Sequence, residues 1–223
     1  MSVIALLMLA DSRLPAGTHA HSGGLEAAVA AGRVNDADDL YAFLLGRLTT
    51  TGLVAAAFSA AATSAQDATT LAELDAEYEA RTPSPVQRRV SRALGRQLLR
   101  AAGAGWPGPA LDLAAAVHPD GPHQPIAFGA AGTAAGITTH DLAVAAALGS
   151  VTGPANAATR LMGIDPDTVT TVLAALEPHV QDTADAATKA ALGPHSELPS
   201  FSAPRLDISA EHHSTWEVRL FAS

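Results

Sequence analysis

Alanine constrains this chain more than any other residue type, because it fills 51 of the 223 positions. Alanine is the strongest helix former and a poor strand residue, and strand-type alternation never extends beyond a few positions here. The composition therefore argues against an all-β sandwich or barrel and predicts packed helices. The length fits one domain, and an apolar fraction of 48% is enough for a sizeable core.

Capping residues indicate where the predicted helices begin and end. Ser22 is a good N-cap for a helix that Gly32 would end, and Ser84 followed by proline is a good start for a longer helix. Such signals predict an all-α, single-domain bundle of about eight to ten helices over residues 1–192. Residues 193–223 contain three prolines and little apolar periodicity, so we expect an extended C-terminal tail. Further N-caps are expected at Asn35 or Asp36 and at Asp165.

Three apolar or uncharged stretches could be either buried core helices or membrane-targeting segments. Val3–Ala10 has the length of a signal peptide, but no Lys or Arg precedes it, so we expect a short buried helix. Leu48–Gln66 and Leu142–Thr159 are rich in Ala, Thr and Ser rather than Leu, Ile and Phe, which favours buried helices over membrane spans. The chain has no cysteine, which excludes disulfides and thiolate metal sites and is consistent with a reducing cytoplasm. We therefore expect a cytoplasmic protein without a membrane segment.

No motif in the chain predicts an enzyme. Gly103–Gly108 matches the spacing of a dinucleotide-binding loop, but it follows a predicted helix and not a strand. His21-Ser22 lacks the strand–serine–helix elbow of a hydrolase, so a serine hydrolase is disfavoured. His19 and His21 are weak candidates for a metal site, because a closed site needs about four ligands and no further ligand clusters there. The sequence predicts no cofactor of its own.

Arginine is concentrated in one predicted helix. The segment 81–100 holds six of the 13 basic residues and no acidic residue, although the whole chain has a net charge of −9. An i, i+4 spacing places four of these arginines along one stripe of a helix. Such a stripe binds an acidic partner or the chain's own acidic surface, or it stays solvated; nucleic acid is the less favoured ligand. The stripe residues are Arg88, Arg92, Arg96 and Arg100.

The C-terminus carries two of the nine aromatic residues of the chain. A segment that merely trails in solution would not carry them, so this end either folds back or binds a partner. Binding is the slightly favoured interpretation. The residues expected to take part are Trp216, Arg219, Leu220 and Phe221.

Four segments together resemble the family of the urease accessory protein UreF, and they span essentially the whole chain. The N-terminal signature is the most specific of them, together with the C-terminal Arg-Leu-Phe-x-Ser pattern. The matching residues are Leu9–Pro15, Gly17 and Ala20–Glu26; Arg88, Ser91, Gly95, Leu98 and Leu99; Pro125–Gly129, Gly136, Ile137, Ala158, Arg160 and Leu161; and Arg219–Phe221 with Ser223. The chain departs from the family pattern at Thr18-His19 and at Ser214.

The resemblance implies a non-catalytic, all-α scaffold that dimerises. Such a protein docks on UreD (also called UreH), and the pair recruits the GTPase UreG to apo-urease and supports insertion of nickel into the urease active site. Nickel is then handled by the complex, with neither nucleic acid nor membrane as a partner. By this resemblance His21, Ser22 and Glu26 form an N-terminal motif that couples to the GTPase; the alternative for Glu26 is a first-turn acid that answers the helix dipole. The competing function is a helical nucleic-acid-binding regulator that uses the Arg81–Arg100 helix.

Overall fold

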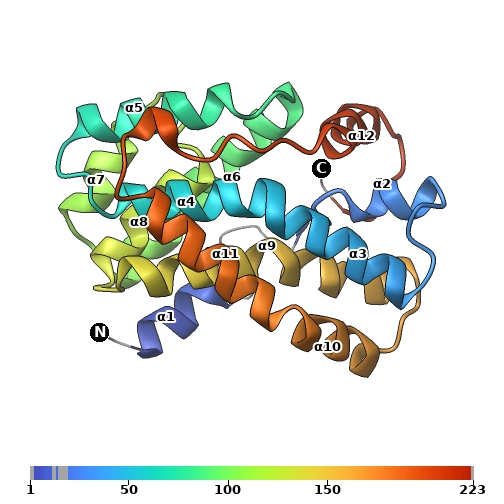
Figure 1. The fold of residues 1–223 in the computed structure, drawn as a ribbon. Helices are drawn as coiled ribbons and strands as arrows, with labels where there is room; N and C mark the ends of the chain where they lie inside the picture. The colour runs from blue at the N-terminus through green and yellow to red at the C-terminus, as the bar shows by residue number, and fades with distance from the viewer. Residues whose placement is uncertain (1–2, 12–13, 15–19, 222–223) are drawn as a thin grey trace.

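The computed structural model describes residues 3–11, 14 and 20–221 of the chain, and these residues form helices and loops without a β-strand. The all-α fold class predicted from the alanine content is thus confirmed. Figure 1 shows the helices packed around α4. The elements are α1 (Val3–Ala10), α2 (Leu25–Ala30), α3 (Ala37–Arg47), the π-helix η2 (Leu48–Gly52), α4 (Leu53–Ala62), α5 (Ala68–Ala80), α6 (Pro85–Gly105), α7 (Pro109–Ala115), α8 (Gln124–Ala134), α9 (Thr139–Leu161), α10 (Pro166–Ala175), α11 (Glu177–Ala190), the 3-10 helix η3 (His195–Glu197) and α12 (Pro204–Ser214).

Helix α4 forms the centre of the core. It packs against α8, α9 and α11, and nearly all of its residues are buried. Small side chains make this close packing possible. A Cβ atom at Gly129 of α8 would lie only 2.6 Å from the backbone oxygen of Ser59 in α4. The alanine-rich composition therefore sets the short distances between helices as well as the helical content.

Helices α3, η2 and α4 follow one another without a break over Ala37–Ala62. This stretch is long and apolar enough by composition to cross a membrane. Its second half, α4, is buried at the centre of the bundle. The π-helical turn at its middle ends at Gly52.

The local capping signals are mostly confirmed. The side chains of Asp36, Ser84 and Asp165 each accept a hydrogen bond from a backbone N–H in the first turn of their helix. Gly32 has a φ of 65° and ends α2 as expected. The N-cap predicted at Ser22 is wrong, because α2 begins two residues later behind Gly24, whose φ of 92° needs a residue without a Cβ.

The expectation of an extended tail over residues 193–223 is wrong for Pro204–Ser214, which form helix α12. Proline at the first position and His212 and His213 in the last turn suit a helix. The buried face of α12 consists of Ser209, Ala210 and His213, so it shows no apolar periodicity in the sequence. That face explains why the pattern of hydrophobic residues did not reveal the helix.

Candidate functional site

The C-terminal end of the chain meets helix α2 at the carboxylate of Glu26. Glu26 lies in the first turn of α2 and is buried. Its Oε1 accepts a hydrogen bond from the N–H of Leu220 at 2.7 Å, and its Oε2 accepts one from the N–H of Phe221 at 3.0 Å. Nε2 of His213 in α12 lies 3.0 Å from the same Oε2. One carboxylate therefore fixes both α12 and the residues that follow it, which we call the C-terminal segment (residues 215–221).

We call the Glu26 carboxylate and the three groups that bind it the clamp. The other two residues of the N-terminal motif, His21 and Ser22, lie beside the clamp. The buried Ser22 hydroxyl accepts a hydrogen bond from the backbone N–H of Glu26 at 3.3 Å. His21 and His213 both line a cavity of about 580 Å³, together with residues of α9 and α12. The sequence placed His21, Ser22 and Glu26 in one motif, and the structure brings that motif together with the C-terminal segment.

The C-terminal segment is anchored at some positions and exposed at others. The Phe221 side chain is buried, and the Trp216 ring packs edge-on against His213 with 4.6 Å between the ring centroids. Leu220 is 71% exposed, and Arg219 is also exposed. Val218 is 86% exposed although its side chain is entirely apolar. The clamp therefore holds the backbone and leaves apolar side chains in water.

Helix α1 presents a second apolar surface. Ala5 and Leu9 are buried where α1 packs on α8 and α9. The opposite face carries Val3, Ile4, Leu7 and Met8, and all four are exposed. The buried helix expected over Val3–Ala10 is therefore buried on one side only.

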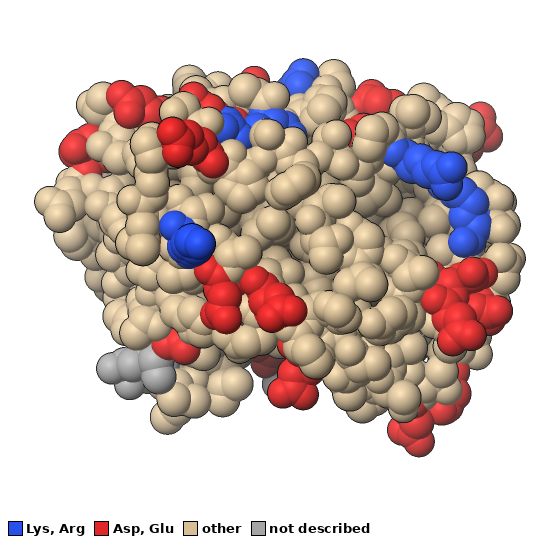
Figure 2. Space-filling model, in the orientation of Figure 1, with Lys and Arg blue, Asp and Glu red and all other residues tan. Residues whose placement is uncertain are grey.

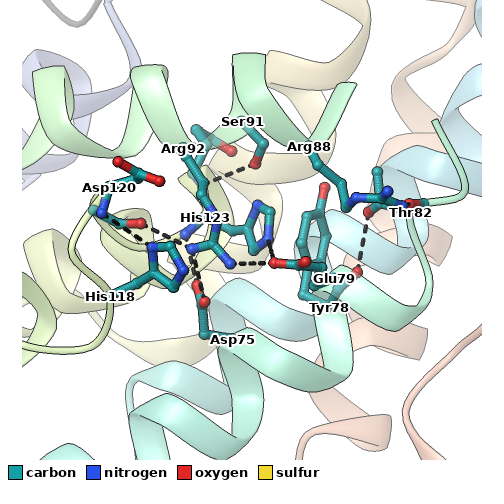
Figure 3. Close-up of polar contacts among 12 residues, drawn as sticks. Asp75, Tyr78, Glu79, Thr82, Arg88, Ser91, Arg92, His118, Asp120 and His123 are labelled. Atoms are coloured by element: carbon teal, nitrogen blue, oxygen red, sulfur yellow. Dashed lines mark hydrogen bonds and ion pairs between the residues drawn. The ribbon is translucent and has the colours of Figure 1, made fainter. Parts of the chain in front are cut away.

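The predicted arginine stripe is divided among different environments. Arg92 is buried, and its Nη1 donates to Oδ2 of Asp75 in α5 at 2.9 Å and to the backbone oxygen of Gly121 at 2.9 Å. Its Nη2 also pairs with the carboxylate of Glu79. The guanidinium of Arg92 thus points at the chain's own acids (Figure 3).

The neighbouring arginines of α6 are less enclosed. Arg88 donates to the backbone oxygens of Thr82 at 2.7 Å and Pro83 at 3.0 Å, and Arg96 donates to the backbone oxygen of Asp120. Arg100 is exposed. On the face drawn in Figure 2 the basic side chains lie in a few separate groups with acidic side chains near them.

Sequence patterns did not indicate the polar cluster that Arg92 joins. Asp75 accepts a hydrogen bond from the backbone N–H of His123 at 2.7 Å, and the His123 side chain is completely buried beside Tyr78. The hydrogen bond from Arg92 lowers the pKa of Glu79, whereas burial lowers the pKa of His123. The members of this cluster come from α5, α6 and the loop before α8, so no local spacing connects them.

The metal candidates remain predictions. His19 lies outside the described residues, and His21 faces the cavity described above. Among residues 3–11, 14 and 20–221, no group of three or more His, Asp or Glu side chains is placed to hold a metal ion.

Comparison with known proteins agrees with the resemblance of the motifs. The family model UreF matches residues 34–177. A urease accessory protein UreF of Mycobacterium sp. (strain JLS) is 43% identical over 225 residues, covering 100% of this chain and 99% of that protein. The UreF proteins of Mycobacterium marinum and Mycobacterium tuberculosis are 42% and 38% identical, each over 100% of this chain and at least 99% of their own length. Family model and full-length relatives together show that this chain belongs to the UreF family of urease accessory proteins.

Proposed function

We propose that this chain is a cytoplasmic adaptor in urease maturation, without catalysis of its own. In this proposal it docks on the accessory protein UreD (UreH), and the pair recruits the GTPase UreG to apo-urease. GTP-dependent insertion of nickel into the urease active site then takes place in the complex. Membership of the UreF family supports this role, and so does the exposed apolar surface at the two chain ends.

The C-terminal segment carries the proposal. Transfer of a large apolar side chain from water to an apolar contact contributes about 1.5–3 kcal/mol, so Val218 and Leu220 offer a favourable contact to a partner. Two hydrogen bonds to Glu26 hold the segment before any partner arrives, and a third, from His213, holds the helix that precedes it. A partner then binds an ordered segment and avoids about 1–2 kcal/mol of ordering entropy for each residue.

Helix α1 supplies a second contact for the same partner or for another member of the complex. Its four exposed apolar residues lie on one face, whereas Ala5 and Leu9 attach the helix to the bundle.

We also propose that the chain acts as a homodimer. Size-exclusion chromatography with light scattering should then give twice the chain mass of 22.5 kDa, and a monomer at all concentrations would contradict this part.

Nucleic-acid binding has less support in the structure. Arg92 bonds to the chain's own carboxylates, and Arg88 and Arg96 donate to backbone oxygens of the chain. A phosphate-binding surface needs several free cations close together. Arg81 lies at the end of α5 and outside α6, and three of the five arginines of α6, Arg88, Arg92 and Arg96, donate hydrogen bonds to groups of the chain itself.

Reconstitution of urease activation tests the proposed function. Apo-urease, UreD, UreG, bicarbonate, nickel and GTP are combined with and without this chain, and urease activity is measured. We expect activation only in the complete mixture and no hydrolysis of GTP or urea by this chain alone. Full activation without the chain, or turnover of either compound by the purified chain, would contradict the proposal.

A further inference from the structure

Arg47, the last residue of α3, connects two parts of the chain that are far apart in sequence. Its Nε donates a hydrogen bond to the backbone oxygen of Ser150 in α9 at 2.8 Å. Its Nη1 donates to the backbone oxygen of Gly23, just before α2, at 2.9 Å. Among the described residues Arg47 forms no ion pair with a carboxylate, so these carbonyl oxygens are its charge-stabilising partners.

The backbone oxygen of Ser150 needs a donor because of Pro154. Pro154 lies inside α9. In a regular α-helix the N–H of residue 154 would donate to the carbonyl of residue 150, and proline has no N–H. The Nε of Arg47 occupies this oxygen. The arginine thus replaces the hydrogen bond that the proline removes from the helix.

The chain before α2 lies directly against this junction. Gly23 has a φ of +60°, and a Cβ there would lie 2.8 Å from Cγ of Pro154 and 3.1 Å from Cζ of Arg47. A Cβ at Gly24, whose φ is +92°, would lie 2.9 Å from Cδ2 of Leu206 in α12. Two adjacent glycines therefore let the backbone pass between α9, Arg47 and α12. Leu25 and Glu26 follow at once.

The π-helical turn after Arg47 brings α3 close to α9. A Cβ at Gly52, the last residue of η2, would lie 2.7 Å from Oγ of Ser150. Only a residue without a side chain permits that approach. Arginine is also specific at position 47, because its planar guanidinium has several donors in fixed directions, whereas lysine has a single nitrogen.

We propose that Arg47 is a positioning residue for the C-terminal segment. By tying the Ser150 carbonyl to the Gly23 carbonyl it fixes where α2 begins, and thereby where the Glu26 carboxylate meets the N–H groups of Leu220 and Phe221. The role of the C-terminal segment as a docking surface rests on the proposed function. The positioning of that segment by Arg47 does not depend on it.

Hydrogen exchange of individual backbone amides tests the proposal on the full chain. Arg47→Met removes both hydrogen bonds, and we expect the amides of Leu220 and Phe221 to exchange at least about tenfold faster, with the buried amides of α4 unchanged. Arg47→Lys keeps the charge but offers a single donor nitrogen, so an intermediate increase is expected. This variant also tests the proposal if Arg47→Met does not fold. Arg160→Met is the control, because Arg160 is an exposed arginine of α9 beside the same cavity. Unchanged exchange at Leu220 and Phe221 in both Arg47 variants would overturn the proposal.

A double-mutant cycle with Pro154→Ala tests the origin of the effect. Alanine restores the N–H at position 154, so the Ser150 carbonyl regains a helical donor without Arg47. We expect Arg47→Met to lower the melting temperature less in the Pro154→Ala background than in the wild-type background. An equal decrease of the melting temperature in both backgrounds would contradict the claim that Arg47 replaces the helical hydrogen bond that Pro154 removes.

Binding of UreD is measured on the same variants to separate the two proposals. Faster exchange at Leu220 with weaker UreD binding supports both. Faster exchange with undiminished UreD binding supports the positioning role and contradicts docking through the C-terminal segment.

Discussion

Replacement of Arg92 by methionine distinguishes a structural arginine from a docking arginine. The side chains of Arg92 and Asp75 are only 10% and 5% exposed, so their ion pair is buried. Removal of one partner of a buried pair leaves the other charge uncompensated and destabilises a protein by about 3–5 kcal/mol. The contact with Glu79 adds little, because the side chain of Glu79 is 44% exposed.

This free energy predicts a measurable change in melting temperature. In a chain of this size, 1 kcal/mol corresponds to about 2–4 °C, so Arg92→Met should lower the melting temperature by about 6–20 °C. Thermal unfolding followed by circular dichroism measures it. Arg100→Met is the matched control in the same helix and should have little effect, since Arg100 is exposed.

The opposite result would refute the assignment. If Arg92→Met melts like the wild-type protein and loses binding to UreD, then Arg92 is a docking residue and the ion pair with Asp75 contributes nothing to stability.

Two further predictions concern the remaining buried polar groups. Glu26→Ala should free the C-terminal segment, because two hydrogen bonds to a carboxylate are lost, each contributing about 1.5–3 kcal/mol. Amide exchange of that segment should become faster. Glu177→Ala removes another first-turn acid and should leave this exchange unchanged; equal effects of the two substitutions would support the helix-dipole interpretation. Because burial lowers the pKa of His123, the unfolded chain binds a proton at a higher pH than the folded one. Stability should therefore be complete above about pH 7 and decrease as the pH falls through about 6.5; urea unfolding of wild type and His123→Phe should show this slope in the wild type only.

Much of the fold follows from short-range chemistry that a sequence displays. Asp36 and Ser84 cap their helices because a short polar side chain reaches an N–H three residues later, and both partners lie in one stretch of sequence. The same local signals did not predict helix α12. It lacks a side-chain cap, and its buried face carries Ser209 and Ala210 in place of large apolar residues.

The candidate site depends on long-range contacts that spacing does not show. The i, i+4 pattern correctly places Arg88 and Arg92 near one another on α6, but Asp75 on α5 decides that Arg92 is buried. The N-terminal motif pointed to Glu26 through family resemblance. Its partners, His213 and the N–H groups of Leu220 and Phe221, lie almost 200 residues later. Two of the three are backbone groups, and the third is a side chain in a helix that the sequence did not predict.

Binding of UreD to a Leu220→Asp variant tests the central claim most directly. Leu220 is 71% exposed and its backbone N–H holds the clamp, so the substitution places a charge on the proposed contact and leaves the fold intact. Leu192→Asp is the matched control, because Leu192 is 87% exposed and lies outside the C-terminal segment. Dissociation constants are measured by calorimetry, with melting temperatures as the check on folding. We expect Leu220→Asp to weaken binding at least about tenfold and Leu192→Asp to leave it unchanged; equal affinity of both variants and the wild-type chain for UreD would contradict docking through the C-terminal segment.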